Sequence, residues 1–90
     1  MKKNKKNIII TGGAGFIGSH LVCTFVKKYP EYNIINIDNL SYASDLDNLN
    51  SIKSAKNYAF YKIDIRDESS ILNIFKKYKI DNVIHLAAES

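Results

Sequence analysis

The chain has 90 residues, of which 46% are hydrophobic and 24% are charged, and this length allows one domain with a modest core. Its formal net charge is +4, and the excess lies in the first six residues, so no further basic stripe predicts a nucleic-acid partner. No stretch reaches the ~20 apolar residues of a membrane-spanning helix, and the single cysteine, Cys23, cannot form an intrachain disulfide, which favours a reducing cytoplasm.

Residues 1–6 carry four lysines and are expected to form a flexible basic tail ahead of a folded part at residues 7–90. Only three consecutive isoleucines separate these lysines from the glycines after Thr11, far fewer than the ~7–15 apolar residues of a signal-peptide core. The tail is therefore interpreted as a solvated terminus and not as a targeting signal or a nucleic-acid arm.

Residues 7–11 form a short apolar run that predicts the first strand, and residues 16–28 have the spacing of an amphipathic helix. The apolar positions of this helix are Ile17, Leu21, Val22, Phe25 and Val26. Two lysines suit its last turn, and Pro30 ends it. Residues 33–37 are again apolar, through three isoleucines, and predict the second strand.

The segment 38–51 is expected to be loop-like, with room for a short helix from Asp45. Ser44 and Asp47 have the spacing of a capping box at the start of this helix. Residues 58–63 contain mostly strand-forming residues and predict the third strand.

Asp67 can cap a second helix, whose expected apolar face is Ile71, Leu72, Phe75 and Tyr78. Residues 82–86 predict the fourth strand. Apolar strands that alternate with amphipathic helices indicate a parallel sheet covered on both faces, and right-handed crossovers favour the strand order 3-2-1-4. The sequence therefore predicts an α/β fold, the N-terminal part of a Rossmann-type doubly wound sheet with the element order β-α-β-β-α-β.

A glycine-rich turn joins the first strand to the first helix. Gly13, Gly15 and Gly18 fit the dinucleotide-binding pattern G-x-G-x-x-G, and Thr11 and Gly12 extend it to the variant T-G-x-x-G-x-x-G. The early glycines let backbone N–H groups approach a pyrophosphate, and the last glycine lets the helix pack close to the sheet. The helix N-terminus adds a partial positive charge, so the turn predicts a dinucleotide phosphate site.

Asp38 lies twenty residues after Gly18, at the end of the second strand, where dinucleotide-binding folds carry an acidic residue. Its carboxylate is expected to accept hydrogen bonds from the ribose hydroxyls of adenosine and to repel a 2′-phosphate. Gly13, Ala14 and Asn39 supply no compensating cation, so the sequence favours NAD over NADP as the cofactor.

The glycine turn, Asp38, the pair at 64–65 and the stretch 85–88 together resemble the extended short-chain dehydrogenase/reductase family of nucleotide-sugar enzymes. Within this family, the segments 38–49 and 85–90 are similar to those of dTDP-glucose 4,6-dehydratases. The resemblance implies an NAD-dependent lyase that forms a 4-keto-6-deoxy sugar nucleotide through transient hydride transfer. It also implies a nucleotide-sugar substrate and a homodimer for the complete enzyme.

The resemblance further implies that the carboxyl ends of the strands form the cofactor site. Backbone N–H groups of Phe16 and Ile17 would contact the pyrophosphate, and Asp64, beside Ile65, would reach the exocyclic amine of adenine. Ser90 would lie near the sugar substrate. The other residues that would border the cofactor are Asn39, Leu40, Ser41, Ser44, Leu86, Ala87, Ala88 and Glu89.

Catalysis in this family depends on a helical Tyr-x-x-x-Lys motif and, in dehydratases, on an acidic pair. Tyr58 and Lys62 have the spacing of the motif, but residues 58–63 predict a strand. Side chains four residues apart lie about 6 Å from each other on a helix and about 13 Å apart on a strand. We therefore expect no catalytic residue and, because His20 and His85 lack partners at ligand spacing, no metal site.

Three alternatives remain open from the sequence alone. The chain could belong to a related nucleotide-sugar epimerase or decarboxylase, to a regulator that binds NAD without turnover, or to a truncated gene product. The fourth strand, at 82–86, is expected to present an unpaired apolar edge. Through this edge, the 90-residue chain is expected to associate with another chain.

Overall fold

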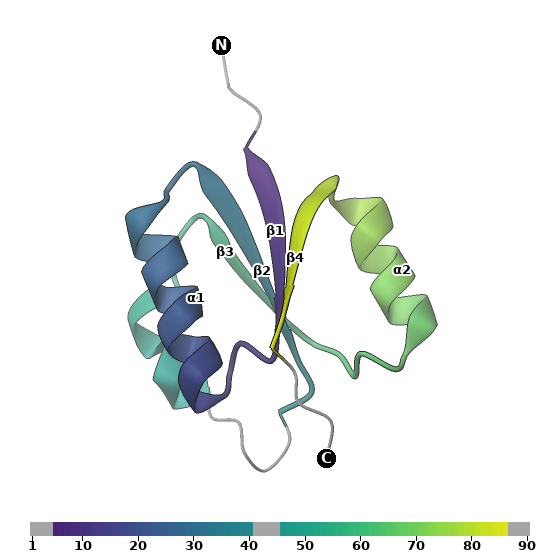
Figure 1. Cartoon of the computed structure of the whole chain (residues 1–90), viewed down its shortest axis with the longest axis horizontal. Coiled ribbons are helices and arrows are strands. Elements are labelled where there is room, and N and C mark those ends of the chain that lie inside the picture. Colours follow the sequence, from purple (N-terminus) through teal and green to yellow (C-terminus); the bar gives the residue numbers. More distant parts are fainter. Residues whose placement is uncertain (1–4, 41–45, 87–90) are drawn as a thin grey trace.

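The computed structural model of the chain describes residues 5–40 and 46–86. Four parallel strands form one sheet in the order β3-β2-β1-β4 (Figure 1), so the predicted fold class and strand order are confirmed. The strands are β1 (Lys6–Thr11), β2 (Tyr32–Asp38), β3 (Tyr58–Lys62) and β4 (Ile80–His85), and their ends lie within two residues of the predicted ones. The helices are α1 (Phe16–Lys28), the 3₁₀ helix η1 (Leu46–Ile52) and α2 (Glu68–Lys77).

The sheet separates two hydrophobic layers, with α1 and η1 on one face and α2 on the other (Figure 1). Successive side chains of a strand point to opposite faces, so Ile8 and Ile10 of β1 pack toward α1 whereas Ile9 packs toward α2. The continuous apolar runs of β1 and β2 therefore serve both layers, as expected for a buried parallel sheet.

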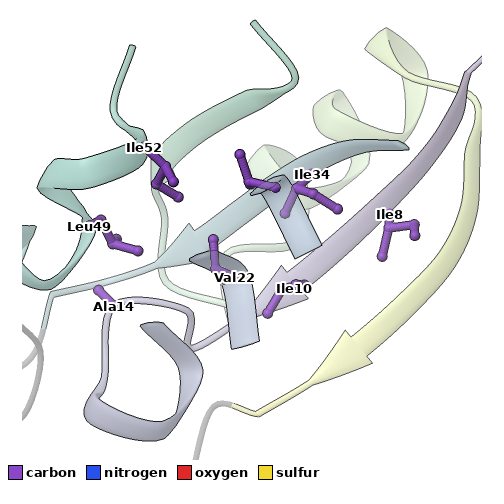
Figure 2. Packing of buried hydrophobic residues seen from close by; sticks show 8 residues of the cluster. Ile8, Ile10, Ala14, Val22, Ile34, Leu49 and Ile52 are labelled. Carbon is purple, nitrogen blue, oxygen red and sulfur yellow. The ribbon is translucent and has the colours of Figure 1, made fainter. Parts of the chain in front are cut away.

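The α1 layer gains two core residues from the segment that the sequence predicts as loop-like. Leu49 and Ile52 of η1 are buried, and Figure 2 shows them beside Ile34 and Val22 in the same cluster. η1 begins at Leu46, close to the expected short helix, and Asp47 lies in its first turn, whereas Ser44, the other residue of the predicted capping box, lies outside the described residues. The 3₁₀ helix η1 is thus a structural part of this face.

The buried face of α1 differs from the predicted one at its first turn. Val22 and Val26 are buried as expected, but the side chain of Ile17 is 75% exposed. In the first turn, the positions that face inward are Gly18 and Ser19, so the prediction that Ile17 packs in the core is wrong.

Only a narrow stripe of α2 packs against the sheet. Ile74 is buried, and Ile71 and Tyr78 pack partly against the strands, a spacing of three and four residues that follows one helical face. Leu72 is 57% exposed, so its predicted place in the apolar face is wrong, whereas Phe75, although 45% exposed, lines a hollow beside Ile71 on the sheet side of the helix. Among the described residues, no helix is long and apolar enough to cross the hydrocarbon core of a membrane.

Two polar side chains fix the ends of the helices. Asp67 caps α2 as predicted, because its carboxylate accepts a hydrogen bond from a backbone N–H group in the first turn. The buried Asn57, which precedes β3, donates from Nδ2 to the carbonyl oxygens of Val26, Tyr29 and Tyr32. Asn57 therefore ties the end of α1 to the start of β2 and β3.

Candidate functional site

The carboxyl ends of the four strands meet at one edge of the sheet, where backbone hydrogen bonds connect them. The N–H group of Gly12 donates to the carbonyl oxygen of Ile37 (2.9 Å), and that of Leu86 donates to Thr11 (2.9 Å). The first residue after β3 donates to the carbonyl oxygen of Asp38 (3.2 Å). Where the structure describes them, the site residues predicted at the strand ends therefore lie next to one another along this edge. Doubly wound folds bind ligands at this edge.

The glycine turn leaves one of its positions open. Gly12 has φ of 77°, a left-handed conformation that favours glycine, and a Cβ atom at Gly18 would collide with the carbonyl oxygen of Gly12. A Cβ atom at Gly15, by contrast, would have Gly12 O as its nearest neighbour, at an ordinary 3.6 Å. Gly15 therefore borders free space from which a ligand can approach the backbone.

The N-terminus of α1 faces solvent beside this open position. Gly15 is its N-cap residue and, having no side chain, supplies no capping acceptor. The first intrahelical bond runs from the N–H of Ser19 to Gly15 O (2.8 Å), which leaves the N–H groups of Phe16, Ile17 and Gly18 without an intrahelical acceptor. These donors and the helix dipole make the turn suited to an anion such as a pyrophosphate.

The carboxylate of Asp38 is built into the same turn. Asp38 is 5% exposed, and its Oδ2 accepts a hydrogen bond from the N–H of Ala14 (2.9 Å). Its Oδ1 accepts one from the N–H of Leu40 (2.7 Å), whose φ of 58° is left-handed. These two backbone contacts fix the carboxylate at the strand end where doubly wound folds bind the ribose of a dinucleotide.

The two backbone contacts of Asp38 were not predicted from the sequence. One signal for the contact with Leu40 was available, because aspartate often accepts a hydrogen bond from the backbone N–H two residues later in the chain. The contact with Ala14 joins residues that are 24 positions apart and depends on the tertiary structure.

Asp64 and Ile65 lie after β3, at the same edge of the sheet. Arg66 donates to the Asp64 carboxylate from its guanidinium group, with an Nη2–Oδ2 distance of 2.7 Å, and from its backbone N–H (2.9 Å). These hydrogen bonds lower the pKa of Asp64 to about 2. The ionised carboxylate is an acceptor at neutral pH, which is the role that a contact with an adenine amine requires.

Ile65 also lines an open apolar hollow of about 260 Å³ on the α2 side of the sheet. The hollow is lined by Ile9, Thr11, Ile37, Ile65, Ile71, Phe75, Val83 and His85. At its polar end, Thr11 Oγ1 and His85 Nδ1 lie 2.6 Å apart, within hydrogen-bond distance, and so join β1 to β4.

The remaining predicted site residues divide into two groups. Asn39 is exposed beside Asp38, and Leu86 directly follows β4 at the shared edge. The predicted residues that lie outside the described part of the chain are Ser41, Ser44, Ala87, Ala88, Glu89 and Ser90.

Two further observations concern the Tyr58–Lys62 spacing and the arrangement of metal-ligating side chains. Tyr58 and Lys62 lie on β3, as predicted, and so do not have the helical arrangement of the family's catalytic motif. Within residues 5–40 and 46–86, no group of three or more His, Cys, Asp or Glu side chains is arranged to hold a metal ion.

Residues 9–90 match the family described as GDP-mannose 4,6 dehydratase. The dTDP-D-glucose 4,6-dehydratase of Homo sapiens is 45% identical over 85 residues, which cover 94% of this chain and 24% of that protein. Sequence similarity therefore extends over nearly the whole chain.

Solved structures from two kinds of enzyme also resemble this fold. A dTDP-glucose 4,6-dehydratase from Bacillus anthracis, in complex with NAD, has a TM-score of 0.90 and 39% identity, covering 93% of this chain and 27% of that one. A UDP-glucose 4-epimerase from Thermotoga maritima, with UDP-glucose, has a TM-score of 0.78 and 42% identity, covering 93% and 25%.

The chain spans about a quarter of the length of these relatives. Its match extends from the second half of β1 through the glycine turn and Asp38 to the last residue. The chain therefore belongs to the GDP-mannose 4,6 dehydratase family, within the extended short-chain dehydrogenases/reductases.

Proposed function

We propose that this chain is the NAD-binding part of a nucleotide-sugar 4,6-dehydratase of the dTDP-glucose type. The observation that carries the proposal is the glycine turn, in which the open side of Gly15 lies beside the uncapped N-terminus of α1. The carboxylate of Asp38 is hydrogen-bonded to the same turn. An anion-binding backbone next to a fixed carboxylate fits the pyrophosphate and the adenosine ribose of a dinucleotide.

In this proposal, each part of the site holds one part of NAD. The N–H groups of Phe16 and Ile17 bind the pyrophosphate, and Asp38 accepts hydrogen bonds from the ribose hydroxyls. Asp64 and Ile65 border adenine through an ionised acceptor and an apolar side chain. The other cofactor contacts proposed from the family resemblance are Asn39, Leu40, Ser41, Ser44, Leu86, Ala87, Ala88 and Glu89.

The reaction we propose for the complete enzyme is the dehydration of a nucleotide sugar, with Ser90 close to that substrate. Bound NAD would supply the hydride acceptor, and a homodimer is the proposed assembly. Similarity to dTDP-glucose 4,6-dehydratases supports this choice. Similarity to a UDP-glucose 4-epimerase supports a second candidate, a related epimerase. A third candidate is a regulator that binds NAD without turnover. Formation of a 4-keto-6-deoxy product by a longer form of the protein would separate a dehydratase from both alternatives.

Calorimetry with NAD⁺ and NADP⁺ tests the cofactor assignment. We expect the protein to bind NAD⁺ more tightly, because the Asp38 carboxylate repels a 2′-phosphate. Asp38→Asn removes the charge and keeps one acceptor oxygen, whereas Asp38→Ala removes both. Charge-assisted hydrogen bonds contribute roughly 1.5–3 kcal/mol, so Asp38→Ala should weaken NAD⁺ binding on the order of tenfold to a hundredfold and narrow the preference.

Lys62 provides the matched control for this experiment. It is the register partner of Asp38 in β3, so it is a cation next to Asp38 that could favour a 2′-phosphate. Lys62→Ala should leave NAD⁺ affinity unchanged and can only lower NADP⁺ affinity. Equal affinity of the unmodified protein for both dinucleotides would contradict the role of Asp38, and binding of neither would contradict the proposed function.

A further inference from the structure

A buried amide lies beneath the glycine turn. Asn36 is the one polar residue between Ile34 and Asp38 in β2, and it is 0% exposed. Its side chain lies on the α1 side of the sheet, where it contacts Tyr58. Its Nδ2 donates to the hydroxyl oxygen of Tyr58 in β3 (3.1 Å). Its Oδ1 is buried and has no hydrogen-bond partner in the part of the chain that the structure describes.

The unpartnered oxygen of Asn36 lies against Gly13. A Cβ atom at Gly13 would collide with Asn36 Oδ1, and it would lie 2.6 Å from Asn36 Cγ and 2.7 Å from Val22 Cγ2. Gly13 is therefore required by the strand and helix beneath it, whereas Gly15 borders open space. The backbone of the turn rests directly on the Asn36 amide.

Three successive residues at the end of β2 hold three successive residues of the turn. The carbonyl oxygen of Ile37 accepts from Gly12, the amide of Asn36 supports Gly13, and the carboxylate of Asp38 accepts from Ala14. These contacts set the height of the turn above the sheet, and thus the position of the backbone that precedes α1.

Packing alone does not explain an amide at this position. A buried oxygen without a partner loses its hydrogen bonds to water, a cost that an apolar side chain would not carry. The hydrogen bond that Asn36 Nδ2 donates to the Tyr58 hydroxyl oxygen fixes the rotation of the amide and so directs Oδ1 at Gly13. Burial raises the pKa of the Tyr58 hydroxyl, which therefore stays neutral under physiological conditions.

We propose that Asn36 is a positioning residue for the pyrophosphate-binding turn and that Tyr58 of β3 orients it. This inference rests on the proposed binding of NAD, and it gives a role to the tyrosine whose spacing to Lys62 imitates the family's catalytic motif. Asn36 acts through Gly13 and does not itself contact the cofactor.

The first test needs no ligand and uses amide hydrogen exchange. Asn36→Ala removes the support, and Tyr58→Phe removes only the hydroxyl that orients it. Both changes should speed exchange at the N–H groups of Gly12 and Ala14 by about tenfold. This factor assumes that the turn loses a restraint similar in free energy to one hydrogen bond. Exchange at Ile71 in α2, whose N–H donates to Asp67 O, should not change.

The second test compares ADP-ribose, which contains the pyrophosphate, with adenosine, which does not. Both variants should weaken ADP-ribose binding by about tenfold and leave adenosine binding unchanged, because only the pyrophosphate rests on the turn. Tyr61→Phe removes a hydroxyl from the opposite face of β3, where it contacts Tyr78, and is the matched control. It should alter neither ligand's affinity.

The outcomes separate this inference from the proposed function. Absence of ADP-ribose and NAD⁺ binding by the unmodified protein would refute the function, while hydrogen exchange would still show whether Asn36 and Tyr58 hold the turn. Unchanged exchange at Gly12 and Ala14 in Tyr58→Phe and Asn36→Ala would overturn the inference. An equal loss of adenosine and ADP-ribose binding would also overturn it, because it indicates general destabilisation.

Discussion

The two faces of the sheet differ in how completely they are covered. On the α1 face, Ile10, Val22 and Ile34 are fully buried, and η1 closes the layer (Figures 1 and 2). On the other face, α2 buries Ile74 but leaves Leu72 largely exposed, and an open hollow lies between this helix and the strands. The same sheet therefore carries one closed core and one partly open layer.

This difference concerns function, because the glycine turn is attached to the closed face. Ala14 is part of the α1 core, and Gly13 packs against Asn36 and Val22. A turn held by a packed core is preorganised for its ligand, so little ordering is needed on binding. The open face reaches the proposed site at Ile65, which lines the hollow.

The most direct way to test the difference between the faces is to truncate one leucine on each. Leu49→Ala in η1 should lower the free energy of unfolding by about 2–5 kcal/mol, because it leaves a cavity in the closed core. Leu72→Ala in α2 should lower it by about 0.5 kcal/mol or less, because that side chain is already mostly hydrated. Urea denaturation measures both values, and equal losses would contradict the comparison.

A valine at Gly15 tests whether the open side of the turn is the ligand site. Gly15→Val places a side chain where we expect the pyrophosphate, so NAD⁺ affinity should fall by about a hundredfold or more, equivalent to about 2.7 kcal/mol. The unfolding free energy should change by less than about 1 kcal/mol, because a Cβ atom at this position would meet only Gly12 O, at an ordinary 3.6 Å. Calorimetry and urea denaturation separate the two effects. Retained NAD⁺ affinity would show that the turn does not hold the phosphates.

The edge strand β4 provides a test of self-association. β4 is an edge strand of the described sheet, and Val83 on it is 51% exposed. We expect the 90-residue protein to associate through this edge, and Val83→Lys to reduce association, because a lysine disfavours strand pairing. Thr24→Lys on the exposed side of α1 makes the same charge change elsewhere and should have no effect. Light scattering that finds a monodisperse monomer of the unmodified protein would refute this expectation.

The smallest expected effect concerns the Asp64–Arg66 pair. Arg66 lowers the pKa of Asp64 to about 2, so Arg66→Ala should return it toward the ordinary value of 3.8. Because the pKa of Asp64 is lower in the folded state than in the unfolded state, the ionised group stabilises the fold at pH values above 3.8. This contribution is lost as the pH falls toward 2. The effect on stability should be small because the pair is exposed.

NMR titration of the Asp64 carboxyl carbon measures its pKa. Glu68→Gln, a nearby change that leaves Arg66 in place, should not alter the titration of Asp64. If the pKa of Asp64 in Arg66→Ala equals its pKa in the unmodified protein, the ion pair does not control the acidity of Asp64.

The sequence was sufficient for features that repeat along the chain. The isoleucine runs in β1 and β2, the cap at Asp67 and the glycine spacing depend on neighbours in sequence, and the fold follows from their order. The motif also located Gly15 and Asp38 at a shared edge, because the carboxyl ends of parallel strands coincide.

Other features depend on packing between distant segments and could not be predicted. Leu49 and Ile52 lie in a 3₁₀ helix too short to show helical periodicity, so their burial had no clear signal. The exposure of Ile17 follows from the position of its turn relative to the sheet. The role of Asn36 requires the contacts with Gly13 and Tyr58, which come from two other elements.

The central claim is that NAD binds to the turn held by the closed face, and a titration of the ¹⁵N-labelled protein with NAD⁺ tests it most directly. We expect the largest amide shift changes from Gly12 to Gly18, with further changes at Asp38–Leu40 and at Asp64–Ile65. Amides in α2, such as those of Leu72 and Lys76, should not shift. Changes centred on α2, or no changes at saturating NAD⁺, would contradict the claim.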